Sequence, residues 1–286
     1  RLERWGGDWR FTNTLAPLVT APFGEQGRSA LSERTKGPTR DAAYIGRMTD
    51  LEREYSPSSR VGGSSEPFVA DHRLRSEAAR ALLAARLTTT SGGTLLVADD
   101  PAAPLLVFIH GGYWQALSAA DSLYLAPAAL AAGWSYAAVE YTIAPAGTLP
   151  SMVDECRAAL ATLAGLVAPA QVVLAGHSAG AHLAAMVSLV GPSPVPIART
   201  VLVSGVFDLR PLVHTTVNLP LGLHEAAAAA ISPQLLRVAA SHEVVVAWGD
   251  NETDAFKAQS RAYAARLAAA GTQVSSVECA GRHHFD

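Results

Sequence analysis

The sequence predicts an α/β protein with a mostly parallel central sheet, helices on both faces and a small helical cap. Short apolar runs bounded by glycine, proline or aspartate are typical of buried strands, and they occur at 105–109, 135–140, 171–175, 200–203 and 243–248. Longer segments with a helical pattern separate these runs, at 119–132, 151–166, 179–189 and 253–270. Strand and helix therefore alternate, which is typical of a parallel sheet covered by crossover helices.

Other segments complete the pattern at its ends. A helix is predicted from about residue 71 through 76–82, a strand at 94–97 and a last strand at 273–278. Residues 208–240 are rich in Leu, Ala, Pro and His, and they interrupt the alternation. We expect this segment to form the small cap over the carboxyl edge of the sheet, because ligands of open α/β sheets bind at that edge.

A single catalytic domain is expected over 48–286. Residues 1–47 carry scattered Gly, Pro and charge without a sustained hydrophobic period. The sequence begins at Arg1, and Met48 would make a natural start. We interpret 1–47 as a leader, a tag or a poorly packed arm; the alternative is an ordinary extension that docks on the domain.

Composition and charge exclude several classes of binding partner. The 286 residues are 49% hydrophobic and 16% charged, which is typical of a globular chain. A net charge of −3 without a long basic run argues against nucleic acid or an acidic membrane surface, and no apolar run is long enough to span a bilayer. The two cysteines, Cys156 and Cys279, exclude a disulfide framework and fit a reduced cytoplasm. We expect a small-molecule substrate; no feature indicates an oligomeric state.

The motif G-H-S-A-G at 176–180 carries the strongest chemical signal. It matches G-x-S-x-G, the nucleophile elbow of α/β-hydrolases, and it lies between an apolar strand and a small-residue helix as that elbow requires. The turn forces strained backbone angles on Ser178, and side chains at 176 and 180 would collide with neighbouring backbone. The sequence therefore predicts the α/β-hydrolase fold with Ser178 as nucleophile.

A glycine loop, H-G-G-Y-W at 110–114, follows the strand at 105–109 directly. In lipases and esterases of this fold, the equivalent loop supplies backbone N–H groups for an oxyanion hole. We predict the N–H groups of Gly112, Tyr113 and Ala179 as the donors. His110 is interpreted as a residue that braces the loop and not as a base.

The general base is predicted in R-H-H-F-D at 282–286, after the last strand, where the fold places its histidine. His284 is favoured because a His-Phe pair is the commoner form in related enzymes, and His283 is the alternative. His177 and His182 flank the elbow and are interpreted as bracing residues.

The acid of the triad is expected just after the strand at 243–248, in G-D-N-E-T-D at 249–254. The acid usually stands three residues after such a glycine, which favours Glu252. Asp250 and Asp254 are the alternatives, although Asp254 is also suited to the first turn of the following helix. Together these residues predict acyl transfer through a serine ester, with no metal and no organic cofactor.

The sequence resembles the arylformamidase, or kynurenine formamidase, family. The resemblance is carried by H-G-G-Y-W-Q at 110–115 and G-H-S-A-G-A-H-L at 176–183, and by segments at 54–58, 143–149, 203–209 and 232–235. It implies hydrolysis of N-formyl-L-kynurenine to L-kynurenine and formate, with side activity on short-chain esters. The family's usual acid is aspartate, where this chain has Glu252.

Tyr113 and Trp114 are expected to contact the substrate. A bulky pair beside the oxyanion loop would exclude larger acyl chains and stack on an aromatic leaving group; the alternative is that Trp114 packs into the core.

Two other functions of the protein stay open. One is a carboxylesterase for short-chain esters without a dedicated formamide substrate. The other is a non-catalytic binding module, which the retained serine, histidine and glycine loop disfavour.

Overall fold

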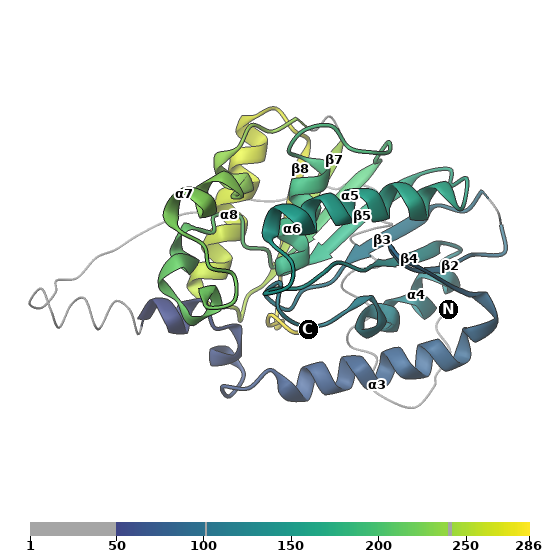
Figure 1. Cartoon of the computed structure of the whole chain (residues 1–286), viewed down its shortest axis with the longest axis horizontal. Helices are drawn as coiled ribbons and strands as arrows, with labels where there is room; N and C mark the ends of the chain where they lie inside the picture. Colours follow the sequence, from purple (N-terminus) through teal and green to yellow (C-terminus); the bar gives the residue numbers. More distant parts are fainter. Residues whose placement is uncertain (1–49, 101, 240–241) are drawn as a thin grey trace, which may run out of the picture.

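The computed structural model describes residues 50–100, 102–239 and 242–286, so the interpretation of 1–47 lies outside the described residues. Within them the chain forms an eight-stranded sheet in the order β1-β2-β4-β3-β5-β6-β7-β8 (Figure 1). The strands are β1 Leu87–Thr90, β2 Gly93–Leu96, β3 Leu105–Ile109, β4 Ser135–Val139, β5 Val172–His177, β6 Arg199–Val203, β7 Glu243–Gly249 and β8 Val274–Cys279.

The sheet is mostly parallel, as predicted. All pairings from β4 through β3, β5, β6 and β7 to β8 are parallel, whereas β1–β2 and β2–β4 are antiparallel. The sequence interpretation omitted β1. Its sequence, LTTT, is partly buried at its two ends and exposed at the two residues between them, so it offers no apolar run to recognise.

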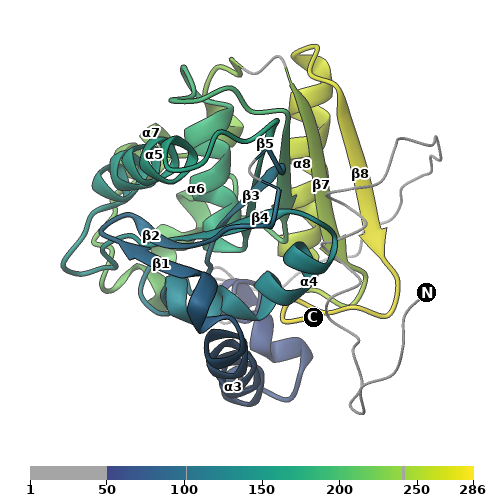
Figure 2. The same ribbon diagram turned by 90° about the vertical axis from the view of Figure 1, so that its right-hand side faces the viewer.

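Helices cover both faces of the sheet. They are α3 Glu66–Leu82, α4 Ala126–Ala131, α5 Leu149–Gly165, α6 Ala179–Ser188, α7 Glu225–Ala230 and α8 Asp254–Ala269. Figure 2 shows α5 and α6 on the side of the sheet opposite to α3 and α4. Alternate residues of β3 follow the same division, because successive side chains of a strand point to opposite faces: Leu105, Val107 and Ile109 join one buried cluster, and Leu106 and Phe108 join the other.

Two helical predictions need correction at their ends. The helix expected at 119–132 is a 3-10 helix, Ala119–Leu125, followed by the short α4. Proline lacks a backbone N–H, but the N–H groups of a first helical turn have no partner within the helix. The proline in the first turn of α4 therefore favours the start of a new helix at this point. Helix α3 begins at Glu66, somewhat more than one turn before the predicted start near residue 71, and also has a proline in its first turn.

The predicted cap is present as short helices between β6 and β7. It consists of 3-10 helices Arg210–His214, Thr216–Asn218 and Pro233–Leu235 together with α7. Leu212 and Ala228 are fully buried and anchor the cap to the core cluster that also contains residues of α6 and α8. Among the described helices, none is long and apolar enough to cross a membrane.

Gly180 in α6 tests how closely this helix approaches the sheet. Helix propensity alone would make Gly180→Ala stabilising by about 1 kcal/mol. A Cβ there would lie 2.0 Å from the carbonyl oxygen of Ile109, and such a clash costs about 1–3 kcal/mol or more. We therefore expect Gly180→Ala to lower the free energy of unfolding in urea denaturation.

Gly165 of α5 is the matched control, because an added Cβ would meet no atom within 4 Å. Gly165→Ala should leave stability unchanged or raise it by up to about 1 kcal/mol. Equal effects of the two substitutions would contradict the proposed close approach of α6.

Candidate active site

Ser178 stands on a sharp turn between β5 and α6. Its backbone has φ 56° and ψ −120°, which is a strained conformation for a residue with a side chain. The flanking glycines are required for the reason that the sequence predicted. A Cβ on Gly176 would lie 2.2 Å from the oxygen of Gly180, and one on Gly180 would lie 2.0 Å from that of Ile109. The turn therefore holds the Ser178 hydroxyl at the carboxyl edge of the sheet.

A chain of hydrogen bonds joins three of the predicted residues. The Nε2 atom of His284 lies 3.0 Å from Ser178 Oγ, and its Nδ1 lies 3.2 Å from Glu252 Oε2. With Nδ1–H donating to the carboxylate, Nε2 is free to accept the serine proton. All three side chains are buried, with Glu252 only 1% exposed. This arrangement is suited to general-base activation of a serine hydroxyl.

Glu252 is held by two further donors. The hydroxyl of Ser204 and the N–H of Gly249 each donate to Oε1 at 2.6 Å. Ser204 is itself buried and has φ 54°, again a strained value. Burial raises the pKa of Glu252, but the hydrogen bonds from His284, Ser204 and Gly249 and the His284 charge outweigh burial and hold the pKa below its usual value. The carboxylate is therefore ionised at neutral pH. Sequence reasoning did not identify Ser204.

The alternative residues lie elsewhere. Asp250 is exposed. Asp254 is in the first turn of α8, where its 90% exposed carboxylate pairs with Lys257 at 3.1 Å. His283 lies 3.3 Å from Asp286 and packs edge-on against Phe68. The structure thus brings Ser178, His284 and Glu252 together and leaves these three alternatives outside the hydrogen-bond chain.

Neutral histidines surround the site. His177 Nε2–H donates to the backbone carbonyl of His284 at 2.8 Å, and burial lowers the His177 pKa to about 3. His110 stacks on Tyr141 with ring centroids 4.2 Å apart, and burial lowers its pKa to about 4. His182 donates to the carbonyl of Ile231 at 2.8 Å, and its pKa is likewise lowered to about 4 by burial. These rings therefore act as uncharged braces.

The glycine loop after β3 faces Ser178 in an unusual backbone conformation. Gly112, Tyr113 and Trp114 have φ values of 95°, 51° and 60° in succession. A Cβ on Gly111 would lie 3.2 Å from that of Ser178, so the loop packs directly against the nucleophile. Among the described residues, the N–H groups of Gly112, Tyr113 and Ala179 donate to no protein acceptor. These donors are thus available for a substrate oxygen.

Trp114 is not a substrate contact, so that part of the prediction was wrong. Its side chain is 0% exposed and belongs to the buried cluster. The indole packs edge-on against His182 with ring centroids 5.2 Å apart. The positive φ values of the loop turn Tyr113 toward the cavity and Trp114 into the core under the loop. Tyr113 lines the cavity and donates its hydroxyl to the carbonyl of Tyr55.

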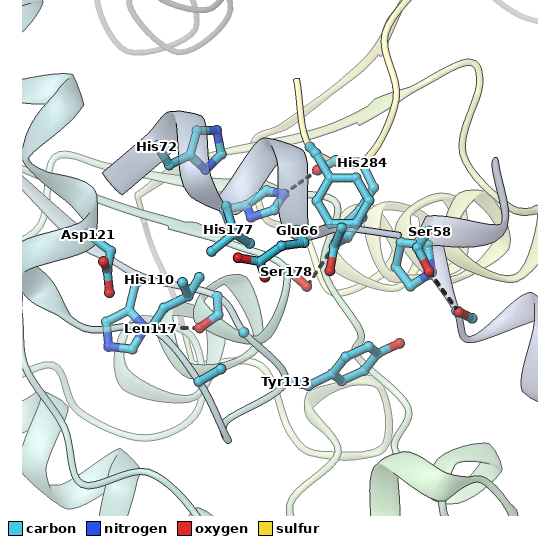
Figure 3. A pocket seen from close by; sticks show the side chains of 18 of the residues that line it. Ser58, Glu66, His72, His110, Tyr113, Leu117, Asp121, His177, Ser178 and His284 are labelled. Carbon is cyan, nitrogen blue, oxygen red and sulfur yellow. Dashed lines mark hydrogen bonds between the residues drawn. The ribbon is translucent and has the colours of Figure 1, made fainter. Parts of the chain in front are cut away.

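A cavity of about 440 Å³ opens over Ser178 (Figure 3). Its floor is the elbow and the glycine loop, and one wall comes from the cap residues Thr216 and Val217. The largest wall is the segment before the sheet: residues 52–58 and the inner face of α3, with Glu66, Val69, His72 and Arg73. Sequence reasoning assigned this wall no role. The E-Y-S-P-S segment at 54–58 was the one available signal.

The geometry and the fold define an α/β-hydrolase, and comparisons agree. A family model of the α/β-hydrolase fold matches residues 106–285. The chain is also similar to a solved structure of a putative thioesterase from Silicibacter sp. TM1040. That structure is 28% identical with a TM-score of 0.71, over 82% of this chain and 92% of the other. The protein therefore belongs to the α/β-hydrolase family.

Two curated relatives define the family more narrowly. The kynurenine formamidase of Danio rerio is 36% identical over 197 residues, which are 65% of this chain and 67% of the relative. The kynurenine formamidase of Salmo salar is 32% identical over 263 residues, covering 83% of this chain and 89% of the relative. Within the α/β-hydrolases, the chain belongs to the kynurenine formamidase family.

Ser204 offers a test of how the Glu252 carboxylate is held. A hydrogen bond to a buried charge stabilises that charge by about 1.5–3 kcal/mol, which corresponds to a factor of roughly ten or more in a rate or an equilibrium constant. Ser204→Ala and Ser204→Gly should therefore both lower the rate at which a fluorophosphonate labels Ser178 by about tenfold. Their stabilities should differ, because glycine adopts the positive φ without strain. We expect the Gly variant to be more stable than the Ala variant by about 1 kcal/mol.

A double-mutant cycle with Glu252→Gln completes this test. If Ser204 acts through the carboxylate, Ser204→Gly should add little to the labelling defect of Glu252→Gln. Additive losses would show that Ser204 acts by another route.

Proposed function

We propose that the protein is an arylformamidase that hydrolyses N-formyl-L-kynurenine to L-kynurenine and formate, with side activity on short-chain esters. The observation that carries the proposal is the buried Ser178–His284–Glu252 chain beside three backbone N–H groups that have no acceptor within the described part of the chain. Family membership supports the choice of substrate. The reaction needs a small-molecule substrate and water, and neither a nucleic acid, a membrane, a metal nor an organic cofactor.

The nucleophilic step follows from the hydrogen-bond chain. Ser178 Oγ attacks the formyl carbon while His284 Nε2 takes its proton. The positive charge that forms on the imidazole is stabilised by the ionised Glu252, which also fixes the ring tautomer. The formyl oxygen, now negative, is held by the N–H groups of Gly112, Tyr113 and Ala179. Each such donor is worth roughly 100- to 1,000-fold in turnover.

The second half of the reaction uses the same groups in reverse. His284 donates its proton to the leaving aniline nitrogen, the C–N bond of the tetrahedral intermediate breaks, and the amine departs and leaves a formyl ester on Ser178. His284 then activates a water that attacks this ester, and formate is released. Because the acyl substituent of a formyl group is a single hydrogen, nearly all of the 440 Å³ cavity is available for the leaving amine.

The site of action is proposed to be the cytoplasm. Both cysteines, Cys156 and Cys279, are unpaired in the described structure. Unpaired thiols are usual in a reducing compartment.

Substrate preference is the first test. We expect kcat/KM for N-formyl-L-kynurenine of roughly 10⁴ M⁻¹s⁻¹ or more, a value typical of enzymes on their own substrates, and lower values for p-nitrophenyl acetate and butyrate. The Ser178→Ala variant, once circular dichroism has verified that it is folded, should hydrolyse none of the three substrates. Fast ester cleavage with negligible formamide turnover would instead identify a short-chain carboxylesterase.

The acid assignment is tested by two matched substitutions that each remove a carboxylate charge. Glu252→Gln should lower kcat about 1,000-fold or more, because the imidazole loses both its tautomer control and its counter-charge. Asp250→Asn should change kcat less than about twofold, since Asp250 is exposed. The measurement is the steady-state kcat of the two purified variants. A larger loss of kcat in Asp250→Asn than in Glu252→Gln would identify Asp250 as the acid instead.

A further inference from the structure

The charged groups that line the cavity are unevenly divided. Three carboxylates reach it, on Glu52, Glu66 and Asp121, but among the described lining residues Arg73 is the one lysine or arginine. Three of the histidines that line the cavity, His72, His110 and His177, add no positive charge at neutral pH. Burial lowers the pKa of His72 and His110 to about 4 and that of His177 to about 3. A negative group on a ligand in this cavity therefore has Arg73 as its cationic partner.

Arg73 is oriented by an ion pair that leaves part of its guanidinium available. Its Nε donates to Asp121 Oδ1 at 3.2 Å, and the other oxygen of Asp121 accepts from Ser118 Oγ at 2.9 Å. The terminal nitrogens of Arg73 make no hydrogen bond to another described residue, and the side chain is 49% exposed. The pair thus presents a positive and a negative group side by side on the cavity wall.

The position of this pair suits the far end of a leaving group. In Figure 3, Asp121 and Ser58 lie at opposite ends of the labelled lining, with Ser178 between them. The lining also includes the apolar or aromatic side chains of Phe108, Leu117 and Tyr124. The carboxylate of Glu52 has no cationic partner among the described lining residues and accepts from the N–H and hydroxyl of Thr216 in the cap. The Arg73–Asp121 end therefore combines a cation, an anion and an apolar approach.

We infer that the Arg73–Asp121 pair is a specificity site for the amino-acid head of the substrate. The guanidinium binds the α-carboxylate and the Asp121 carboxylate binds the α-ammonium, while the aryl formamide reaches Ser178. The site selects zwitterionic aryl formamides over neutral ones that share the same reacting group. The inference rests on the proposed function, because it assigns the end of the cavity that the leaving amine occupies.

The test compares two substrates with one reacting group. N-formyl-L-kynurenine carries the amino-acid head, and 2′-formamidoacetophenone has the same aryl ketone and formamide without it. We expect Arg73→Gln to lower the ratio of their kcat/KM values about 10- to 100-fold, which is the range for loss of a charged hydrogen bond, mainly through a higher KM for the zwitterion. Arg73→Lys keeps the charge but not the planar fork, so its ratio should be intermediate.

Arg80→Gln is the matched control, since Arg80 is an exposed arginine on the same helix that does not line the cavity. It should leave the substrate ratio unchanged. An unchanged ratio in Arg73→Gln would overturn the inference. If kcat/KM falls equally for both substrates, Arg73 only supports the position of α3.

Binding of L-kynurenine separates this inference from the proposed function. Calorimetric titration of the wild-type enzyme and of Arg73→Gln needs no turnover. The inference predicts a Kd at least about tenfold weaker for the variant. If neither formamide is hydrolysed by the wild-type enzyme, the formamidase proposal fails, and the titration still decides the head-group site. Absent or equal binding of L-kynurenine to the two proteins would contradict the inference.

Discussion

The close approach of α6 to the end of β3 is the constraint on which the rest of the site depends. Gly180 packs on the carbonyl of Ile109, where a Cβ would lie only 2.0 Å away. This contact brings the elbow serine against the glycine loop, so that Ser178 and the backbone donors of the loop face one cavity. The strained φ values of Ser178 and Tyr113 are costs of that geometry, and the surrounding sheet and helices must offset them. A chain without glycine at 180 would separate the nucleophile from its oxyanion donors.

Parallel strand order supplies the remaining groups. Adjacent strands β5, β6 and β7 end at the same edge, and directly after them the chain places Ser178, Ser204 and Glu252. His284 arrives after β8, next to β7 in the sheet. Burial of Glu252 would by itself favour its neutral form, but three hydrogen bonds and the charge on His284 reverse that preference. A carboxylate that is both buried and ionised suits an imidazole that must carry a positive charge during catalysis.

The parts predicted from sequence share a local cause. G-H-S-A-G between an apolar strand and a small-residue helix, and the glycine loop after β3, are dictated by backbone sterics within a few residues, and the structure has them where expected. The features that the sequence did not predict depend on contacts between residues far apart in the chain. Residues 52–58 and the inner face of α3 line the cavity only because the chain folds back over the sheet edge. Trp114 looked suited to an aromatic substrate, but its direction is set by a backbone conformation that composition does not reveal. Strand β1 lacks an apolar run because it lies at the edge.

Formyl transfer to Ser178 is the central claim, and partitioning of the acyl-enzyme tests it most directly. N-formyl-L-kynurenine and p-nitrophenyl formate should pass through the same formyl ester although their leaving groups differ. With hydroxylamine added as a competing nucleophile, the ratio of formohydroxamate to formate should therefore be the same for both substrates at each hydroxylamine concentration. Unequal ratios, or hydrolysis of N-formyl-L-kynurenine that persists in Ser178→Ala, would contradict a common intermediate on this serine.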